Sequence, residues 1–443
     1  MKQKLKRFYD AHSDIWLLRF LFQAYRCIKG FLLSPLQDLV AILQLAKWKH
    51  FGQHSDRPIR VCFVQQDPNC WNKSKALYDL LNQDARFEVS LLCIPDPFDP
   101  DTGSTYRFFK ERGYNAIDAR IGDGPWDTQT NQGQWFDLKS LKPDYLFYQQ
   151  PYDNYLPNAY RSTVVYRYAK ICHTPYGFAL IKELLDCMVR DFCRCVYRTY
   201  SVSELEKDFN IRRFPLSHRL GLRNTIYFSP LVFANFFQEQ DSQSPSWEFS
   251  KNSFRAIWTP RWTTDEKLGG SNFFRYKDVL LSYADSHPDA DILMRPHPMA
   301  FDNFVRTGQM TPEQVQDYIA NCNGRRNTAL DRAKNYDATF WQSSVLVSDV
   351  SAVIVEYFVT GKPIIFCPTE KRGSTYLSNF EKICSSCYIA TNQQELTDYL
   401  DQLRQGNDPL ANKRQQVIRE LFGDDPTQAP AKIRDDLLAD FGL

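Results

Sequence analysis

Short apolar segments alternate with amphipathic helices along two stretches of the chain, and this alternation constrains the fold more than any other feature of the sequence. In the N-terminal half, strand-like apolar runs occupy 59–65, 87–94, 144–149, 166–173 and 194–202. Helical periodicity fills 71–83 and 177–190, whereas the Pro-, Asp- and Gly-rich segment 95–134 is expected to be a long insertion or loop. Strands that alternate with helices form a parallel sheet covered by helices on both faces.

The same pattern restarts after the polar run 237–247, which we interpret as a linker. Strands are predicted at 254–260, 291–296, 344–349 and 363–368, and helices at 276–286, 351–361, 393–405, 410–421 and 428–440. A length of 443 residues suits two or three domains, at roughly 150 residues per domain. We therefore predict an α/β protein of GT-B architecture, in which two doubly wound Rossmann-like domains face a cleft.

This interpretation divides the chain into four parts. They are a basic amphipathic helical leader at 1–57, an N-terminal Rossmann-like domain at 58–236, a C-terminal Rossmann-like domain at 248–415, and a C-terminal helix at 416–443.

The leader carries most of the positive charge of the chain. Residues 1–60 contain eleven Lys or Arg and four Asp, an excess of seven, although the whole chain has a net charge of only +2. Apolar side chains recur at helical spacing in 15–25, which Arg19 interrupts, and no cleavage site follows. Two interpretations stay open: a helical cap packed on the main body, or an interfacial helix attracted to anionic lipid. We expect a cytoplasmic protein that attaches peripherally to the inner face of the membrane through 1–50.

Composition argues against several other classes of protein. A net charge of +2 gives no indication of nucleic acid binding. Most of the twelve cysteines lie within apolar runs, as is typical of free thiols in a reducing compartment. The pair Cys384 and Cys387 lacks the second pair that a zinc ribbon needs. We therefore predict no metal and no cofactor.

Candidate functional residues follow the predicted strands, where ligands bind in open α/β sheets. Arg295 and His297 follow the apolar run 292–294 at the end of the strand at 291–296, and the prolines on both sides of His297 stiffen the turn. His173 ends a strand of the N-terminal half and is the only histidine there with a similar placement. Two histidines that face each other across a cleft would suit a base and a charge-stabilising partner in group transfer.

Two further clusters offer donors for an anion. The strand at 344–349 ends at Ser348 and Asp349, and a helix is expected to open near Ser351, with free N–H groups at its start. Plain N-capping would explain the same residues equally well. Thr259 and Arg261 follow the strand at 254–260, where the guanidinium could bind a phosphate or could stack on Trp262.

Together these residues resemble the CDP-glycerol glycerophosphotransferase family, of teichoic acid primase and polymerase type, over roughly 165–370. The resemblance lies in His173-Thr174-Pro175, Gly221-Leu222-Arg223-Asn224, Thr259-Pro260-Arg261-Trp262, Arg295-Pro296-His297-Pro298, Ser348-Asp349-Val350-Ser351 and Lys362-Pro363-Ile364-Ile365. The sequence departs from the family pattern in lacking a glycine after His173 and a lysine shortly beyond it, and in having Ala352 where the family has a second serine.

The resemblance implies a GT-B enzyme with an N-terminal acceptor domain and a C-terminal domain for the donor nucleotide. His173 would be the catalytic base and His297 a second catalytic group on the donor pyrophosphate. Donor contacts would come from a set of polar residues: Arg223, Thr259, Arg261, Arg295, Ser348, Asp349 and Ser351. The implied reaction moves glycerol phosphate from CDP-glycerol to a hydroxyl of a polysaccharide or lipid-linked acceptor and releases CMP, in the synthesis of capsule, teichoic acid or lipopolysaccharide.

Three alternatives remain open on the same scaffold. A glycosyltransferase would use a CMP- or UDP-sugar, with attack on an anomeric carbon. A sugar-nucleotide epimerase would need further carboxylates in the cleft, for which Asp67, Glu356 and Glu370 are available. A non-catalytic component of a capsule-export complex would need neither.

Overall fold

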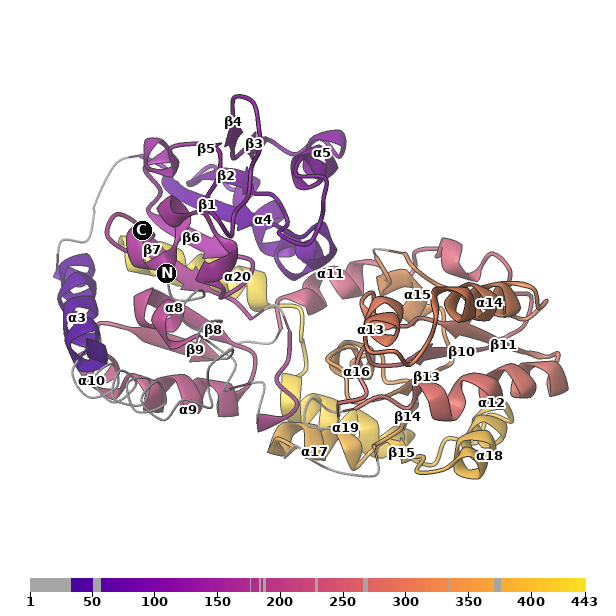
Figure 1. Ribbon diagram of the computed structural model, residues 1–443. Coiled ribbons are helices and arrows are strands. Elements are labelled where there is room, and N and C mark those ends of the chain that lie inside the picture. The colour runs from indigo at the N-terminus through magenta and orange to yellow at the C-terminus, as the bar shows by residue number, and fades with distance from the viewer. Residues whose placement is uncertain are drawn as a thin grey trace, which may run out of the picture.

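The computed structural model describes residues 33–50, 57–175, 177–182, 185, 189–227, 230–265, 270–333, 335–369 and 376–443. It contains two α/β domains, each built on a parallel sheet, which lie side by side in Figure 1. The expected α/β class and GT-B arrangement are confirmed. The helix expected at 177–190 is only partly described: residues 177–181 are not helical, and Ile181 instead forms an isolated antiparallel bridge with Tyr376. The apolar segment 15–25 lies outside the described residues.

The N-terminal domain has a seven-stranded sheet with the order β3-β2-β1-β6-β7-β8-β9. Its strands are β1 (Ile59–Gln65), β2 (Phe87–Cys93), β3 (Ala116–Asp118), β6 (Tyr145–Tyr148), β7 (Lys170–His173), β8 (Val196–Ser201) and β9 (Asn224–Tyr227). All neighbouring strands are parallel. The order reverses between β1 and β6, where the chain switches from building one side of the sheet to building the other.

The C-terminal domain has a six-stranded parallel sheet with the order β12-β11-β10-β13-β14-β15. Its strands are β10 (Phe254–Thr259), β11 (Ala290–Met294), β12 (Thr328–Leu330), β13 (Val345–Ser348), β14 (Ile364–Phe366) and β15 (Tyr388–Ile389). The order reverses between β10 and β13, where Thr259 pairs with Ser348. This switch point opens a crevice beyond the strand ends.

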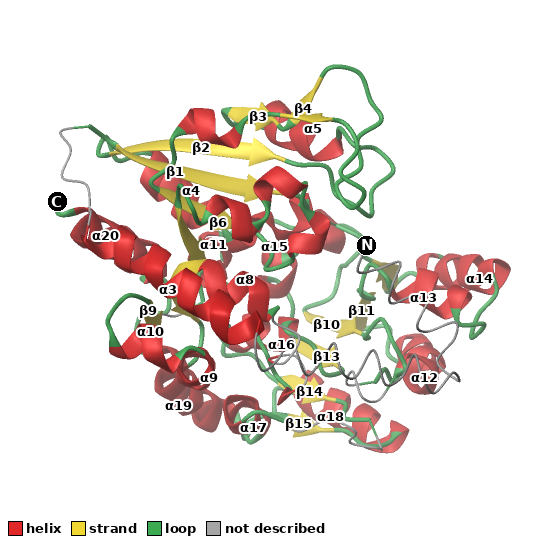
Figure 2. Cartoon of the chain, turned by 60° about the vertical axis from the view of Figure 1, so that its left-hand side comes forward, coloured by secondary structure: helices red, strands yellow, loops and turns green. Residues whose placement is uncertain are grey.

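Helices cover both faces of each sheet (Figure 2). The principal helices of the N-terminal domain are α3 (Ser34–His50), α4 (Lys75–Asn82), α5 (Ser104–Glu111), α6 (Ser162–Val165), α8 (Arg190–Cys195), α9 (Glu204–Arg213), α10 (Pro215–Arg219) and α11 (Val232–Gln238), with the short 3₁₀ helices η2 (Pro68–Lys73) and η3 (Leu138–Leu141). Those of the C-terminal half are α12 (Phe273–Ser286), α13 (Ala300–Arg306), α14 (Pro312–Asn323), α15 (Asp337–Trp341), α16 (Val353–Phe358), α17 (Ser378–Cys384), α18 (Gln393–Arg404), α19 (Ala411–Phe422) and α20 (Ala429–Phe441).

The buried strands are apolar along most of their length because helices cover both sides of them. All five residues of β11 are buried, and so are all four of β6 and all four of β13. Each sheet therefore separates two apolar clusters, one on each face. The segment 95–134, expected to be an insertion or loop, in fact contributes α5 and the edge strand β3, followed by the small hairpin of β4 (Arg120–Ile121) and β5 (Gln134–Trp135).

The two ends of the described chain both pack on the N-terminal domain. The last helix, α20, returns from the C-terminal domain and buries Ile433, Leu437 and Phe441 in the same cluster as β1 and α4. At the other end, α3 buries Ala41 and Leu45 against this domain, so α3 is a structural cap on that face. Among the described residues, no helix has the length and apolarity that a membrane crossing requires.

Candidate active site

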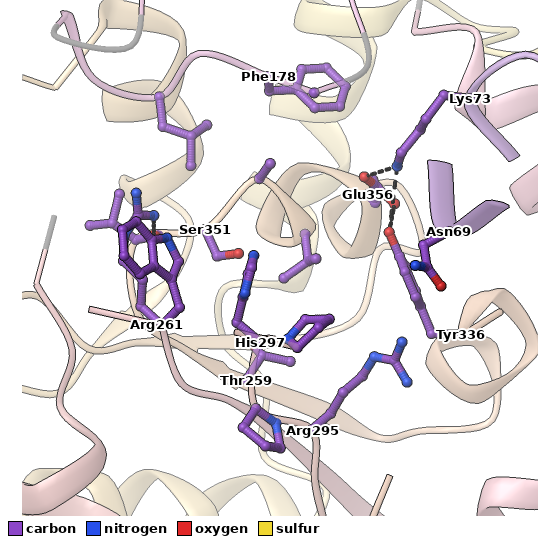
Figure 3. Close-up of a pocket in the computed structure, with 18 of the residues that line it drawn as sticks. Asn69, Lys73, Phe178, Thr259, Arg261, Arg295, His297, Tyr336, Ser351 and Glu356 are labelled. Carbon is purple, nitrogen blue, oxygen red and sulfur yellow. Dashed lines mark hydrogen bonds and ion pairs between the residues drawn. The ribbon is translucent and has the colours of Figure 1, made fainter. Parts of the chain in front are cut away.

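A cleft of about 760 Å³ lies between the two domains, and the carboxyl ends of their strands form much of its wall. Six of the residues singled out in the sequence line it: His173, Thr259, Arg261, Arg295, His297 and Ser351. Figure 3 shows Arg261, His297 and Ser351 in one group, and Lys73, Glu356 and Tyr336 in a second group across the cavity. The structure thus brings together strand ends that are more than a hundred residues apart in the chain.

His173 is the last residue of β7 and is almost completely buried, at 3% exposure. Its ring packs edge-on against Phe192, with 5.6 Å between the ring centroids. Burial lowers the pKa of the imidazole to about 4, because the surrounding apolar side chains disfavour the charged form. Its Nδ1 atom is buried and has no hydrogen-bond partner among the described residues. The cleft therefore contains a neutral imidazole that can accept a proton.

His297 lies on the opposite domain, in the turn after β11, and is exposed to the cleft. Its backbone N–H donates to the carbonyl of Pro260 at 3.2 Å, and its Nδ1 accepts from the backbone N–H of Met299 at 3.2 Å. The cleft walls and then the neighbouring Arg261 lower the pKa of the imidazole. A neutral ring whose Nδ1 accepts must carry its proton on Nε2, so we assign Nε2–H as a hydrogen-bond donor.

Arg261 follows β10 and is held by the turn after β13. Its backbone N–H donates to Asp349 Oδ2 at 2.9 Å, and its guanidinium donates to the carbonyl of Val350. The Nε atom is buried without a hydrogen-bond partner among the described residues. Burial lowers the pKa of the guanidinium and Asp349 raises it, so the net shift is downward, yet an arginine stays charged. This leaves a cation with spare hydrogen-bonding capacity on the wall of the cleft.

Arg295 also lines the cleft, but its donors are used within the C-terminal domain. It forms an ion pair with the buried Asp331, donates to the carbonyl of Ala333 at 2.7 Å, and stacks over the ring of Tyr336 at 4.6 Å. Asp331 balances its charge. Arg295 is therefore more firmly fixed in the wall than Arg261.

Ser348 and Asp349 are fully buried and do not line the cleft. Ser348 accepts a 2.8 Å hydrogen bond from Thr259, which joins the ends of β10 and β13 at the switch point. Asp349 accepts hydrogen bonds from the backbone of Arg261 and from the side chains of Ser271 and Asn272. Ser348 and Asp349 therefore hold the cleft wall in place. Ser351, two residues after Asp349, lines the cavity.

Arg223 lies apart from the other predicted residues. It is buried under α8, donates to the carbonyls of Cys193 and Arg194, and stacks over Phe214 at 4.5 Å. It is not among the residues that line the cleft. The described structure therefore places it as a packing residue between β9 and α8.

A polar cluster crosses the cleft, of which the sequence analysis named only Glu356, as a carboxylate available to an epimerase, and missed Lys73 and Tyr336. Lys73, from η2 in the N-terminal domain, forms an ion pair with Glu356 of α16 in the C-terminal domain. The hydroxyl of Tyr336 donates to the other oxygen of Glu356 at 2.7 Å. Glu356 is 2% exposed and Lys73 12%. Because η2 begins shortly after the carboxyl end of β1, the strand-end rule that selected His173 could have selected Lys73 too.

No metal site is evident in the part of the chain that the structure describes: no three His, Cys, Asp or Glu side chains there are grouped to hold an ion. The ten cysteines described are free, and eight of them are buried.

Comparisons with known proteins agree with this geometry. Residues 254–437 match the model of the family described as CDP-Glycerol:Poly(glycerophosphate) glycerophosphotransferase. No curated protein matches the sequence at a significant level.

Solved structures share the fold at low identity. A putative UDP-N-acetylglucosamine 2-epimerase from Listeria monocytogenes has a TM-score of 0.58 and 13% identity, covering 87% of this chain and 97% of its own. The UDP-GlcNAc 2-epimerase from Neisseria meningitidis gives 0.57 and 13%, covering 86% and 100%. The wall teichoic acid polymerase TagF gives 0.56 and 14%, covering 92% and 98%.

At these identities, the solved structures establish only the two-domain fold. Inferences about the chemistry rest on the family match and on the residues that line the cleft. The match covers the C-terminal domain, with Thr259, Arg261, Arg295, His297 and Ser351 inside it. The resemblance seen in the sequence is thereby confirmed over residues 254–437, which match the CDP-glycerol glycerophosphotransferase family model.

Proposed function

We propose that this chain transfers glycerol phosphate from CDP-glycerol to an acceptor hydroxyl and releases CMP, in the synthesis of a cell-surface polymer such as teichoic acid, capsule or lipopolysaccharide. The observation that carries the proposal is the neutral, buried His173, which faces a C-terminal domain of the glycerophosphotransferase family across the cleft. TagF, which has a similar fold, is a wall teichoic acid polymerase, and one of its variants was solved with CDPG.

His173 acts as the general base in this proposal. The acceptor oxygen attacks the β-phosphorus, its proton passes to the imidazole, and the bond between the β-phosphorus and the bridging oxygen breaks, so that CMP leaves. A pKa of about 4 keeps the ring unprotonated at neutral pH. A positioned base contributes roughly 10²–10⁴ in rate.

Arg261 and His297 stabilise the phosphates of the donor. Arg261 supplies a fixed positive charge, and His297 supplies a neutral Nε2–H donor from the same wall. Ser351 adds a hydroxyl beside them. Donors held in place before the reaction cost little reorganisation when charge develops, which is why each is worth roughly 3 kcal/mol in comparable sites.

The test is a panel of activated donors: CDP-glycerol, CMP-sugar, UDP-sugar and UDP-N-acetylglucosamine. We expect CMP release from CDP-glycerol alone, and its loss when Arg261 is replaced by Met. His287, which stacks on Tyr283 at 4.1 Å outside the cleft, gives a matched control as His287→Ala. Epimerisation of the UDP-sugar, or release of nucleotide only from sugar donors, would exclude this function.

The proposed acceptor is a polysaccharide or a lipid-linked polymer, reached at the inner face of the membrane through residues 1–50. Support comes from α3, whose outward positions Leu36, Leu39, Val40 and Leu43 are between 48% and 64% exposed and recur at helical spacing. Since α3 also packs through Ala41 and Leu45, the cap and the membrane role are compatible. Replacing Leu36, Leu39 and Leu43 by Ser should weaken binding to anionic vesicles and leave the melting temperature nearly unchanged.

A further inference from the structure

A second pocket, of about 470 Å³, lies on the N-terminal domain away from the cleft. Its walls come from the last turn of α3, the start of β1, the loop after η3 and the end of α20. The amino ends of β1, β6 and β7 lie at this edge, whereas the cleft lies at their carboxyl ends. In Figure 1, α3 lies on the side of the N-terminal domain that faces away from the C-terminal domain. None of the pocket's residues lines the cleft.

The pocket is strongly basic. Five cationic side chains line it against one carboxylate, Asp144; these cations are Arg57, Arg60, Lys139, Lys142 and Lys170. Asp144 pairs with Arg57, Glu88 with Arg60, and Asp440 with Lys170. Lys139 and Lys142 form no ion pair with any residue that the structure describes. Their charges remain available to an anion.

Aromatic rings form the rest of the wall. Trp48 donates its indole N–H to the carbonyl of Tyr166 at 3.1 Å, which fixes the end of α3 beside the pocket. The ammonium group of Lys139 lies 5.5 Å from the ring centroid of Tyr168. Amphipathic rings beside cations are characteristic of protein surfaces at the headgroup level of a membrane.

The pocket lies at the C-terminal end of α3, the helix that carries the exposed apolar stripe Leu36, Leu39, Val40 and Leu43. Lys47 and Lys49, in the last turns of the same helix, are also exposed. An apolar stripe and a basic cavity at the end of the same helix match the two layers of a membrane surface, the acyl chains and the phosphate groups. A soluble anion would need only the cavity.

We propose that this pocket binds the phosphate headgroup of an anionic membrane lipid, held by Lys139 and Lys142 while the α3 stripe enters the acyl layer. This site deepens the membrane attachment in the proposed function and rests on it, but it uses residues outside 1–50. It would orient the domain with the amino ends of its strands toward the membrane.

The experiment compares partition of the full chain onto phosphatidylglycerol-containing and pure phosphatidylcholine vesicles. The pocket variant is Lys139→Gln with Lys142→Gly. Lys142 has φ 45°, a backbone conformation that glycine adopts more easily, so the second change removes charge without straining the fold. The control, Lys251→Gln with Lys413→Gln, removes the same charge from two exposed lysines outside the pocket.

We expect the pocket variant to lose roughly tenfold or more in partition onto anionic vesicles, since each basic residue near an anionic surface contributes about fivefold. The control should lose much less, and phosphatidylcholine vesicles should bind all three proteins weakly. Equal losses in both variants would overturn the proposal in favour of general charge attraction. Unchanged partition, with saturable binding of soluble glycerol phosphate, would assign the pocket to a soluble anion instead.

A separate readout distinguishes this proposal from the proposed function. Turnover of CDP-glycerol with a water-soluble acceptor should be the same in the pocket variant and the wild type, because Lys139 and Lys142 lie outside the cleft. Absence of turnover in both proteins would reject the transferase proposal and leave the vesicle result to be judged by itself.

Discussion

Two histidines in the cleft are kept neutral in different ways. Burial among apolar side chains lowers the pKa of His173, whereas the cleft walls and then the neighbouring Arg261 lower the pKa of His297, whose Nδ1 accepts from a backbone N–H. The first ring can therefore accept a proton, and the second can donate a hydrogen bond from Nε2. Their division into base and phosphate donor rests on these environments rather than on the residue type.

His173→Ala should lower kcat by about 10²-fold or more and change donor affinity little, as the loss of a general base does. Single-turnover kinetics and equilibrium binding of CDP-glycerol separate the two effects. Collapse of donor binding with kcat preserved would make His173 a binding residue instead.

The low pKa of His173 also makes stability depend on pH. In the unfolded chain the pKa of the His173 imidazole is near its ordinary value of 6.5, and in the folded chain it is about 4, so stability falls as the pH drops between these values. Between pH 7.5 and pH 5 we expect a loss of about 2 kcal/mol from this group. Denaturant unfolding of wild type and His173→Asn at both pH values should show this contribution in the wild type alone. An identical pH dependence in both proteins would mean that the ring is not held neutral.

His297→Ala should reduce turnover by roughly 10²–10³-fold, the usual cost of removing one preorganised donor. Because the side chain is exposed to the cleft, the melting temperature should shift little. A variant that melts early, or that keeps normal turnover, would contradict the role assigned to this residue.

At the scale of elements, the alternating pattern predicts the long central strands well. β1, β2, β8, β10 and β13 lie within one or two residues of their predicted ranges, because each is four to seven residues long and rich in β-branched, aromatic or other apolar residues. The edge strands β9, β12 and β15 are only two to four residues long and are partly polar, so they have no periodicity to detect. β3 was missed for the same reason, within a segment rich in turn residues.

The expectation that ligands bind beyond the carboxyl ends of strands located most of the cleft residues. It could not distinguish side chains that line the cavity from side chains that are buried in its wall. Thr259 and Ser348 pair across adjacent strands, yet only Thr259 lines the cleft. Arg223 shows the other limit. Its motif resembles a donor-binding segment, whereas its partners are the carbonyls at the end of α8, which lie thirty residues away in sequence.

The ion pair between η2 and α16 yields a prediction at this scale. Glu356→Gln leaves the ammonium group of Lys73 without its partner in a mostly buried position, which typically costs 3–5 kcal/mol. Adding Lys73→Met should recover much of this loss, and a double-mutant cycle by denaturant unfolding measures the coupling. If the single variant is as stable as the wild type, the pair does not join the two domains.

The C-terminal helix α20 connects the two domains of the molecule. Local sequence patterns could not predict this connection. An amphipathic helix at 428–440 is evident from its periodicity, but periodicity does not identify the surface that the helix covers. In the structure α20 leaves the C-terminal domain and completes the core of the N-terminal one. The two domains are therefore linked twice, once through α11 and once through the segment between α19 and α20.

Asp440 is the polar centre of this second link. Its carboxylate accepts hydrogen bonds from Lys170, Arg198, Tyr145 and Tyr197, which lie on three strands of the N-terminal sheet. Burial raises the pKa of the carboxyl, but Arg198 and Lys170 more than offset this effect and keep it ionised. Removing it would leave two buried cations with fewer partners.

Asp440→Ala should therefore destabilise the N-terminal domain by several kcal/mol, although the change lies three residues from the end of the chain. Hydrogen exchange measures this region by region: amides of β6, β7 and β8 should exchange faster, whereas those of β10 and β13 should not change. Asp435, which pairs with the adjacent Arg434 and is 61% exposed, provides the matched control as Asp435→Ala. Faster exchange confined to α20 itself, with the N-terminal strands protected as in the wild type, would show that the helix covers this domain without stabilising it.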